Sequence, residues 1–384
     1  MSKYGILEDE SQSFEGQARF VVFGVGGGGG NAVEHMVQQG VKGVTFVVAN
    51  TDRQALDMLS VPNKFQLGAQ ANRGLGAGAN PEVGRAAAES DEDEIRAILS
   101  DYDMVFITAG MGGGTGTGAA PVVARIAKEL GILTVAVVTT PFKFEGGKRI
   151  KAAKDGIEQL TAHVDSIITI PNEKLQQVYR NLSMREAFKK ADDVLLQGVN
   201  GLAQTIRAAG YMNIDFNDIR TAMTAKGHAM MGIGRASGDD RARQAAEKAI
   251  RSPLLDDLRL ENAKGLLINI TAREVMMSEP VEIAEAVGSI TDLDEGNIFY
   301  GVVEDETMGD DIQVTIIATG LTVDERPKVA PRPMPAMQAD PSQHTSALQQ
   351  QQAYQQGQAV PAQNSFGGKK PLNVSDFLKN HSQS

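Results

Sequence analysis

The sequence predicts an α/β fold: a domain with a mostly parallel sheet, a long helix, a second and smaller α/β domain, and a disordered C-terminal linker and tail peptide. Three observations predict this. In the first half of the chain, short apolar runs alternate with helical segments, as in a parallel sheet covered by helices on both faces. A long segment with helical period follows, before a second group of strands and helices. Beyond residue 320 the apolar periodicity ends, and proline and glutamine become frequent.

The apolar runs of the first half have the length of buried strands. We expect strands over residues 19–25, 44–49, 103–109, 132–139 and 166–170. Helices are expected over 31–39 and 81–99, and the second of these has Asn80 as its N-cap and Pro81 at its first position. The order of strands and helices is Rossmann-like. We therefore predict a domain over residues 19–184, preceded by a flexible tail of residues 1–18.

The segment with helical period is predicted to connect two domains. Apolar side chains recur at every third or fourth position, and Gly210 suits the C-terminal cap. These side chains are Phe188, Ala191, Leu195, Val199, Leu202 and Ile206. We expect a connecting helix over 185–210 and a second domain over 211–320. That domain is predicted to contain strands over 266–270, 298–303 and 314–318 and helices over 242–250 and 281–290.

Composition excludes several classes of protein. The chain has no cysteine, and its five histidines lie far apart without the spacing of a metal site. The net charge of −11 argues against binding nucleic acid or anionic lipid by bulk electrostatics. The first residues lack the pattern of a secretory signal, and the longest apolar run, 132–138, is too short for a membrane helix. We therefore expect a cytoplasmic protein.

Two glycine-rich loops each follow a predicted strand and precede a helix. The first, residues 24–29, fits the dinucleotide fingerprint GxGxxG, in which the backbone approaches a phosphate at a helix N-terminus. By itself it fits a nicotinamide-cofactor enzyme, another nucleotide binder, or a turn without a ligand. The second, residues 109–118, is a further anion cradle that a dehydrogenase does not need. The Walker motif GxxxxGK[ST] does not occur in the sequence.

The run from Gly112 to Gly118 reads Gly-Gly-Gly-Thr-Gly-Thr-Gly and resembles the signature of the tubulin/FtsZ family of GTPases. The resemblance covers most of residues 19–320. It implies a GTP-binding first domain in a cytoskeletal subunit that polymerises head to tail into the bacterial division ring. Loops of small residues would then hold the phosphates of GTP. They are Gly27, Gly28, Gly29, Gly30 and Asn31; Gly76, Ala77, Gly78 and Ala79; and Gly112, Gly113, Gly114, Thr115, Gly116, Thr117 and Gly118.

The resemblance also assigns the groups around the ribose. Glu145 would accept hydrogen bonds from the ribose hydroxyls, and Arg149 would point to the phosphates. Asn172 would contact the ribose or the base. Judged by local sequence alone, Glu145 and Arg149 form an ordinary i,i+4 ion pair on a helix surface.

The base would be recognised by the long helix. The resemblance implies that Phe188 stacks on the purine and that Asp192 accepts from guanine N1–H and N2–H together. Adenine has an acceptor at N1 and would leave this carboxylate unpaired. Judged locally, Phe188 fits a core position and Asp192 a solvated helix face. The sequence does not decide between Asp192 and Asp193 as the residue that faces the base.

The motif Asn213-Ile214-Asp215-Phe216-Asn217-Asp218 follows the long helix. Locally, Asp215 is a good N-cap for a helix that starts near Phe216. The resemblance implies a second role, in which Asn213, Asp215 and Asp218 orient the water that attacks GTP. A helix of about 25 residues spans about 37 Å, so the motif must act on the nucleotide of the next subunit. Mg²⁺ would be bound mainly through the GTP phosphates, helped by Asp215 and Asp218.

The C-terminal part is predicted to be a tether and a binding peptide. Residues 321–370 lack the apolar periodicity of a core, and we expect a disordered linker. Residues 371–384 contain Val374, Phe377, Leu378 and Lys379 and resemble the adaptor-binding peptide of the family, although its proline and leading acid are missing. We therefore expect membrane-tethering adaptors and division regulators as partners, without insertion of the chain into the membrane.

Three other interpretations make different predictions. A dehydrogenase would show the absorbance of its cofactor, and it leaves the second glycine loop unexplained. A plasmid-partition filament would share the GTPase but has no need of an adaptor-binding tail. A non-hydrolysing scaffold would have no need to retain Asn213, Asp215 and Asp218. An increase in light scattering after addition of GTP would support the polymer.

Overall fold

The computed structural model describes residues 18–178, 182–207, 215–224, 227–252, 254–255, 263–288 and 298–321. All of them belong to one compact unit that ends at Asp324. The predicted N-terminal tail lies outside these ranges apart from Ala18. The predicted linker lies outside them apart from Leu321, and the predicted tail peptide does so entirely. The predictions for these segments stay predictions.

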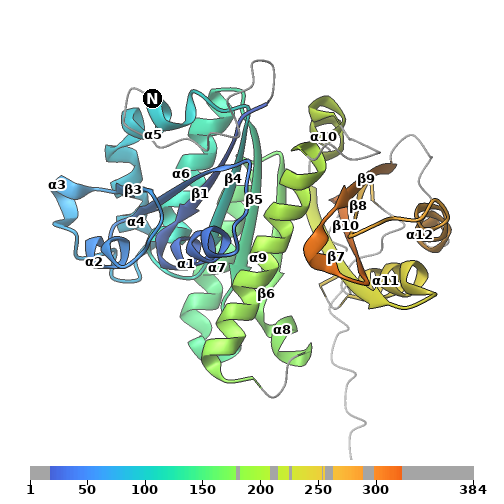
Figure 1. Cartoon of the computed structure of the whole chain (residues 1–384). Helices are drawn as coiled ribbons and strands as arrows, with labels where there is room; N and C mark the ends of the chain where they lie inside the picture. Colours follow the sequence, from blue (N-terminus) through green and yellow to red (C-terminus); the bar gives the residue numbers. More distant parts are fainter. Residues whose placement is uncertain are drawn as a thin grey trace, which may run out of the picture. The chain divides into compact units, whose positions relative to one another are not determined.

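A ten-stranded sheet runs through this unit in the order β3-β2-β1-β4-β5-β6-β7-β10-β8-β9 (Figure 1). Neighbouring strands from β3 to β7 are parallel, as are β8 and β9, whereas β10 is antiparallel to β7 and β8. The predicted α/β fold with a mostly parallel sheet is confirmed. The strands are β1 (Phe20–Val25), β2 (Thr45–Asn50), β3 (Asn63–Gln66), β4 (Met104–Gly110), β5 (Leu133–Thr140), β6 (Ser166–Pro171), β7 (Gly227–Ser237), β8 (Gly265–Ala272), β9 (Ile298–Glu304) and β10 (Asp311–Leu321).

Helices cover both faces of the parallel part of the sheet, because each crossover between parallel strands passes over a face. The α-helices are α1 (Gly26–Gln38), α2 (Arg53–Asp57), α3 (Ala69–Asn72), α4 (Pro81–Ser90), α5 (Glu92–Leu99), α6 (Thr115–Glu129), α7 (Gly147–Thr161), α8 (Asn172–Val178), α9 (Met184–Arg207), α10 (Phe216–Met223), α11 (Arg241–Ile250) and α12 (Glu279–Gly288). Two short 3-10 helices are η2 (Lys143–Glu145) and η5 (Glu306–Met308).

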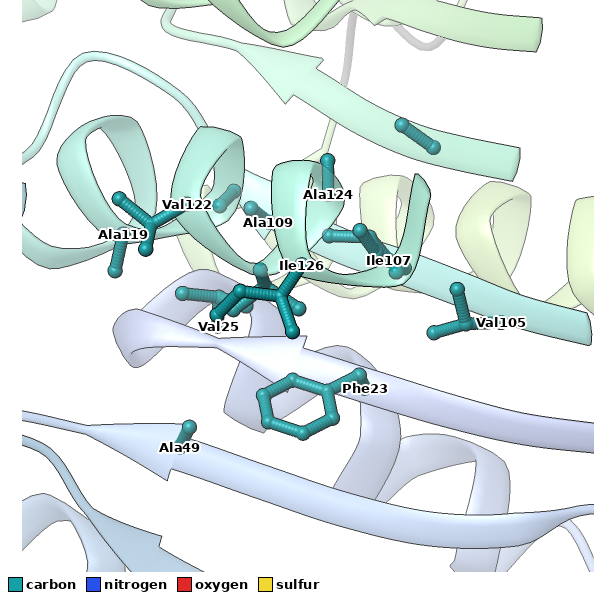
Figure 2. Packing of buried hydrophobic residues seen from close by; sticks show 14 of the residues in the cluster. Phe23, Val25, Ala49, Val105, Ile107, Ala109, Ala119, Val122, Ala124 and Ile126 are labelled. Atoms are coloured by element: carbon teal, nitrogen blue, oxygen red, sulfur yellow. The ribbon is translucent and has the colours of Figure 1, made fainter. Parts of the chain in front are cut away.

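The side chains of β1 alternate between two cores, as the pleat of a strand requires. Phe23 and Val25 belong to the core formed with α4 to α7, and Figure 2 shows them beside Ile126 of α6. Phe20 and Val22 belong to the opposite core, formed with α1, α9 and α10. Every residue of β1 is therefore buried. Burial on both faces explains why this strand appears in the sequence as an unbroken apolar run.

The long helix α9 confirms the predicted apolar stripe at four of its six positions; Phe188 differs, and the side chain of Ile206 lies outside what the structure describes. Ala191, Leu195, Val199 and Leu202 are buried in the core that α9 shares with β5, β8 and β10. Phe188 is instead 42% exposed. In Figure 1, α9 begins beside α8 and ends beside α10, so it runs along the whole length of the parallel strands.

Strand β7 was not among the strands expected from the sequence. It pairs in parallel with β6 and antiparallel with β10, and so joins the first six strands to the last three. Two of its glycines lie under α11: a Cβ at Gly232 would meet Ala249 O, and one at Gly234 would meet Ala245 O. The strand is rich in glycine because a helix backbone packs directly on it. One sheet thus crosses both predicted domains, and the predicted domain boundaries stay predictions.

Two predicted helix boundaries differ in the structure. The helix expected over residues 81–99 is divided into α4 and α5 at Asp91, whose carboxylate accepts from Gly68 N–H at 2.6 Å. The helix expected over 31–39 already begins at Gly26, so the glycine run forms the first turns of α1. Close packing on β4 holds these glycines in the helix, since a Cβ at Gly28 would lie 3.0 Å from Gly110 Cα.

Candidate functional site

The first glycine loop is the start of α1, directly after β1. Gly26 has a φ of +73°, which favours glycine, and a Cβ there would lie 2.7 Å from Gly116 N. The next residue, Gly27, is exposed, and nothing lies within 4 Å of a Cβ at this position. Asn31 is also exposed on the same helix. The first turn of α1, with its free N–H groups, therefore faces open space.

The second glycine loop connects β4 to α6 and is fixed by hydrogen bonds. Gly112 N–H donates to Thr117 Oγ1 at 2.8 Å, and Met111 N–H donates to Thr139 O of β5 at 2.9 Å. Gly113, between them, is half-buried, with nothing within 4 Å of a Cβ. The two hydrogen bonds therefore fix the loop against α6 and β5, and Gly113 is left facing open space.

The third loop, which precedes α4, is packed against the second. Thr51, directly after β2, links the two loops: its carbonyl oxygen accepts from Gly76 N–H at 3.2 Å, and its hydroxyl forms a buried hydrogen bond with that of Thr115 at 2.6 Å. A Cβ at Gly114 would lie 2.7 Å from Ala77 Cβ. Ala79 has a φ of +58°, which is unusual for a residue with a Cβ and indicates local strain. Three loops that are distant in sequence therefore meet at the carboxyl ends of β1, β2 and β4.

These loops fit an anion such as a polyphosphate. Each contains a glycine with open space in front of it, namely Gly27, Gly78 and Gly113. Each leads into a helix, whose N-terminus carries the positive end of the helix dipole. Among the described residues, no side chain caps the first N–H groups of α1 and α6, whereas Asn80 caps α4 by accepting from Glu82 N–H. The structure brings together the phosphate-binding residues that were predicted from the sequence. The contact of each residue with a phosphate stays a prediction.

Glu145 and Arg149 lie next to the second loop. Arg149 Nη1 donates to Glu145 Oε2 at 2.7 Å, and Phe142 N–H donates to Glu145 Oε1 at 2.9 Å. The i,i+4 ion pair considered from the sequence is confirmed. Glu145 is the more buried partner, with a side chain 15% exposed against 51% for Arg149. A Cβ at Gly112 would lie 2.8 Å from Arg149 O, which places the pair at the edge of the phosphate loops.

Asn172 and Phe188 have incomplete environments in the described part of the chain. Asn172 starts α8 at the carboxyl end of β6 and is buried, and its Oδ1 has no hydrogen-bond partner among the described residues. A buried acceptor without a donor costs free energy, so a donor from a ligand would restore stability there. The ring of Phe188 meets Phe142 edge-on at 5.3 Å. Its exposed face contradicts the core position considered from the sequence.

Asp192 and Asp193 are adjacent on α9 but differ in their partners. Asp193 Oδ1 accepts from His35 Nε2–H at 2.7 Å, and Asp193 Oδ2 accepts from Lys190 at 2.8 Å. Burial raises the pKa of Asp193, but these hydrogen bonds outweigh it and hold the pKa below its usual range. Within the described ranges, no group donates to the Asp192 carboxylate. Burial, together with the charge of Asp193, raises the pKa of Asp192 to about 7. Asp192 is therefore the carboxylate that is available to a ligand.

The predicted catalytic residues Asp215 and Asp218 lie near the amino end of β1, whereas the glycine loops lie at the carboxyl ends of the strands. Asp215 caps α10 by accepting from Asp218 N–H at 2.8 Å, so the local interpretation as an N-cap is confirmed. Phe216, the next residue, packs on Phe20 at the start of β1, with ring centroids 6.1 Å apart. The first glycine loop lies at the opposite end of β1, about 17 Å away at 3.3 Å per residue. Asn213 lies outside the described residues.

Two polar residues near the glycine loops and the first turns of α9 were not predicted from the sequence. Thr51 follows the strand expected over 44–49, and its position at a carboxyl strand end was a signal that could have identified it. His35 had no comparable signal, because its partner Asp193 is 158 residues away. No group of three or more His, Cys, Asp or Glu placed to hold a metal ion occurs within the described residues.

None of the helices in the described part of the chain is long and apolar enough to cross a membrane.

Comparison with known families matches both halves of the chain. Residues 19–180 match the model of the Tubulin/FtsZ family, GTPase domain, and residues 227–322 match that of the FtsZ family, C-terminal domain. Curated relatives include two proteins named Cell division protein FtsZ. The one from Wigglesworthia glossinidia brevipalpis is 51% identical over 310 residues, which is 80% of each chain. The one from Coxiella burnetii is 53% identical over 306 residues, which is 79% of each chain.

Solved structures agree with these sequence matches. A structure described as "FtsZ dimer, empty" from M. jannaschii superposes with a TM-score of 0.76 at 41% identity. The match covers 81% of this chain and 90% of that one. Sequence and fold therefore point to the same family.

Proposed function

The chain belongs to the tubulin/FtsZ family of GTPases, and from this membership we propose that it polymerises head to tail and hydrolyses GTP at a site completed by the next subunit. The membership itself makes it a tubulin-like cell-division GTPase that binds guanine nucleotide. The reaction converts GTP and water to GDP and phosphate. The polymer, the shared site and the role of each residue are the proposal.

The nucleotide would lie across the three loops and the start of α9. The open glycines Gly27, Gly78 and Gly113 support contacts between backbone N–H groups and the phosphates. The buried, unpaired Oδ1 of Asn172 supports a hydrogen bond to a ribose hydroxyl or to the base. Glu145 would accept from the ribose, and Arg149, 51% exposed, can turn to the phosphates.

The base would be held by the first turns of α9. The exposed ring of Phe188 supports stacking on the purine. Asp192 supports recognition of guanine, because its carboxylate can accept from N1–H and N2–H together. A site built to pair such an edge rejects a base that lacks it by up to about 10⁴-fold. We therefore expect GTP to bind far more tightly than ATP.

The position of α10 is the observation that carries the proposal of a shared site. Phe216 packs on Phe20 at the amino end of β1, whereas the first glycine loop lies at the carboxyl end. From Phe188 to the end of α9 at Arg207 the helix rises about 28 Å at 1.5 Å per residue. Asp215 and Asp218 are thus too far from the nucleotide of their own subunit. They can act only on a nucleotide that a second copy presents to them.

The reaction would follow from this arrangement. Asp215 and Asp218 of one subunit orient a water in line with the γ-phosphate held by the next, and one carboxylate accepts its proton. The bond between the γ-phosphorus and the bridging oxygen breaks, and GDP leaves with that oxygen. Asn213 would fix the water or the γ-phosphate. Mg²⁺, bound mainly through the phosphates and helped by Asp215 and Asp218, would neutralise charge there.

Exposed apolar side chains support self-association. Leu75 in the third loop is 84% exposed and Phe144 in η2 is 60% exposed, both near the nucleotide loops. A second group precedes α12, where Met276 is 58% exposed and Met277 is 92% exposed. A head-to-tail contact needs two different surfaces on one chain, and exposed apolar patches mark such surfaces. The dimer solved for the M. jannaschii relative agrees with this.

The cellular role would depend on the C-terminal peptide. Val374, Phe377, Leu378 and Lys379 would bind membrane-tethering adaptors or division regulators, with residues 321–370 as the tether. The polymer would then assemble in the cytoplasm, at the midcell division ring. These residues lie outside the described ranges, so their sequence alone supports this part.

The shared site can be tested with two inactive variants. Asp215→Asn keeps an N-cap, because asparagine caps as well as aspartate, but removes the carboxylate. It should bind GTP and assemble, with hydrolysis slower by about 10²–10⁴-fold. Gly114→Val should lose GTP, because Ala77 and Asn80 leave no room for a side chain. A mixture should recover turnover where α10 of a Gly114 variant meets the GTP of an Asp215 variant.

Two observations would contradict the shared site. One is the absence of any recovery in the mixture while both variants still co-assemble with the wild type. The other is a specific activity that stays constant down to concentrations at which no filament exists. The control is Gly288→Ala, which lies at the end of α12 with open space in front of it and should change neither binding nor turnover.

A further inference from the structure

His35 links the two helices that would surround the nucleotide. It lies in the last turn of α1 and is 9% exposed, and its Nε2 is 2.7 Å from Asp193 Oδ1 on α9. A carboxylate only accepts hydrogen bonds, so Nε2 carries the hydrogen. Asp193 Oδ2 accepts from Lys190 at 2.8 Å. Both oxygens of Asp193 are therefore engaged by donors within the chain.

The link lies close to the proposed phosphate-binding and base-binding residues. Asn31 and His35 are four residues apart on α1 and share a face, as do Phe188 and Asp192 on α9. The first turn of α1 forms the first glycine loop. The hydrogen bond between His35 and Asp193 thus joins α1, which begins with a phosphate loop, to α9, which carries the proposed base-binding residues.

We propose that His35 is a positioning residue for guanine recognition. By holding Asp193, it keeps this carboxylate away from the base, offsets its charge beside Asp192, and fixes α9 against α1. Asp192 alone is then left to accept from guanine. This inference rests on the proposed role of Asp192 as the reader of the base.

The electrostatics explain why such a residue is needed. Two adjacent carboxylates on one helix repel each other, and the charge of Asp193 disfavours the ionised form of Asp192. Donors to Asp193 offset part of that charge. Without His35, Asp193 keeps a single donor among the described residues, the partly exposed Lys190 on its own helix. It can then turn toward the base or weaken Asp192 as an acceptor.

The experiment compares GTP with ITP, whose base lacks the N2 amino group. Affinities are measured by competition with a fluorescent guanine nucleotide on the full chain, below the concentration of assembly. His35→Leu fills the buried position without a donor. It should lower GTP affinity about tenfold, as for loss of a charge-assisted hydrogen bond, and reduce the preference for GTP over ITP. His35→Gln restores a donor and should recover most of both.

Matched variants separate positioning from a general loss of structure. Gln38→Ala on the same helix removes only a surface hydrogen bond to Glu34 and should change neither affinity. Asp193→Asn removes the charge that His35 controls. In that background, His35→Leu should have little further effect on the preference for GTP. Additive effects, or equal loss of GTP and ITP affinity in His35→Leu, would overturn the inference.

The variant Asp192→Asn separates a failure of the proposed base recognition by Asp192 from a failure of the proposed role of His35. An unchanged preference for GTP over ITP in this variant would show that Asp192 does not read the base, and the proposed function would need revision at that point. A lost preference in Asp192→Asn, with the preference intact in His35→Leu, would overturn the role of His35 alone. A circular dichroism spectrum of each variant checks that the fold is retained.

Discussion

The open glycines of the nucleotide loops and the glycines of β7 under α11 look alike in sequence but have opposite environments. Gly27 and Gly113 have nothing within 4 Å of a Cβ, on the side where a ligand would approach. Gly232 and Gly234 of β7 face the backbone of α11, and a Cβ there would meet its carbonyl oxygens. A glycine-rich segment therefore indicates the approach of either a ligand or another backbone. Only the space in front of the glycine distinguishes the two.

The same contrast extends to polar groups. Near the nucleotide loops, Asn172 Oδ1 has no donor among the described residues and Asp192 is partly desolvated. Beside α11, by contrast, Arg241 pairs with Glu279 at 2.6 Å and also donates to two backbone carbonyls. In the first region, polar groups lack hydrogen-bond partners within the described ranges, and a nucleotide would supply them. In the second region, Arg241 and Glu279 already have their partners in the free chain. Substitutions should thus act mainly on binding in the first region and on stability in the second.

The largest effect on stability is expected in β7. Gly234→Ala places a Cβ against Ala245 O and Ala249 N, which belong to a helix backbone and cannot move aside as a side chain would. The free energy of unfolding should fall by about 3 kcal/mol, as for an overpacked core. Urea unfolding of the nucleotide-free chain measures this change. Gly288→Ala is the control and should stay within about 0.5 kcal/mol of the wild type. Equal stability of both variants would break the comparison.

A smaller effect is expected from Asp192, and its sign depends on pH. Burial and the charge of Asp193 raise the pKa of Asp192 from 3.8 to about 7 in the folded chain. Between these values the folded chain holds a proton that the unfolded chain has lost. The stability from this group is thus full below pH 4 and is lost as the pH rises through 7.

Asp192→Asn should remove this loss, so that the nucleotide-free variant becomes more stable than the wild type above pH 7. GTP affinity of the wild type should show the opposite trend and rise through pH 7, because only the ionised carboxylate can serve as the proposed acceptor for guanine. Thermal unfolding and nucleotide titration between pH 5 and pH 8 check both trends. Parallel pH curves for the wild type and the variant would contradict the assignment.

The smallest effect on stability is expected at Gly27. Gly27→Ala adds a methyl group into open space in the first turn of α1, where alanine favours the helix. Stability should rise by about 0.5 kcal/mol. GTP affinity should fall, because the added methyl occupies the path of the phosphates. A variant that is more stable and binds GTP as well as the wild type would show that this glycine does not face the nucleotide.

Much of the fold could be predicted from local patterns. The strands expected over 19–25, 103–109 and 132–139 agree with β1, β4 and β5 to within one residue at each end. Burial on both faces makes such strands continuously apolar, so they stand out in the sequence. The helix expected over 185–210 agrees with α9 over the residues that the structure describes. The first two glycine loops were recognisable because each lies between a strand and a helix, and the third because it precedes a helix with Asn80 as its N-cap.

Only the tertiary structure decided the choices that depend on distant partners. Strand β7 was not recognised in the sequence because it has glycines where a strand usually has apolar side chains. The backbone of α11 packs on these glycines. The division between α4 and α5 depends on the bond from Gly68 N–H to Asp91. The distinction between Asp192 and Asp193 depends on His35, 158 residues away. Apolar periodicity in the sequence indicates which face of a single element is buried. These features depend instead on contacts between elements that are distant in sequence, and periodicity does not indicate such contacts.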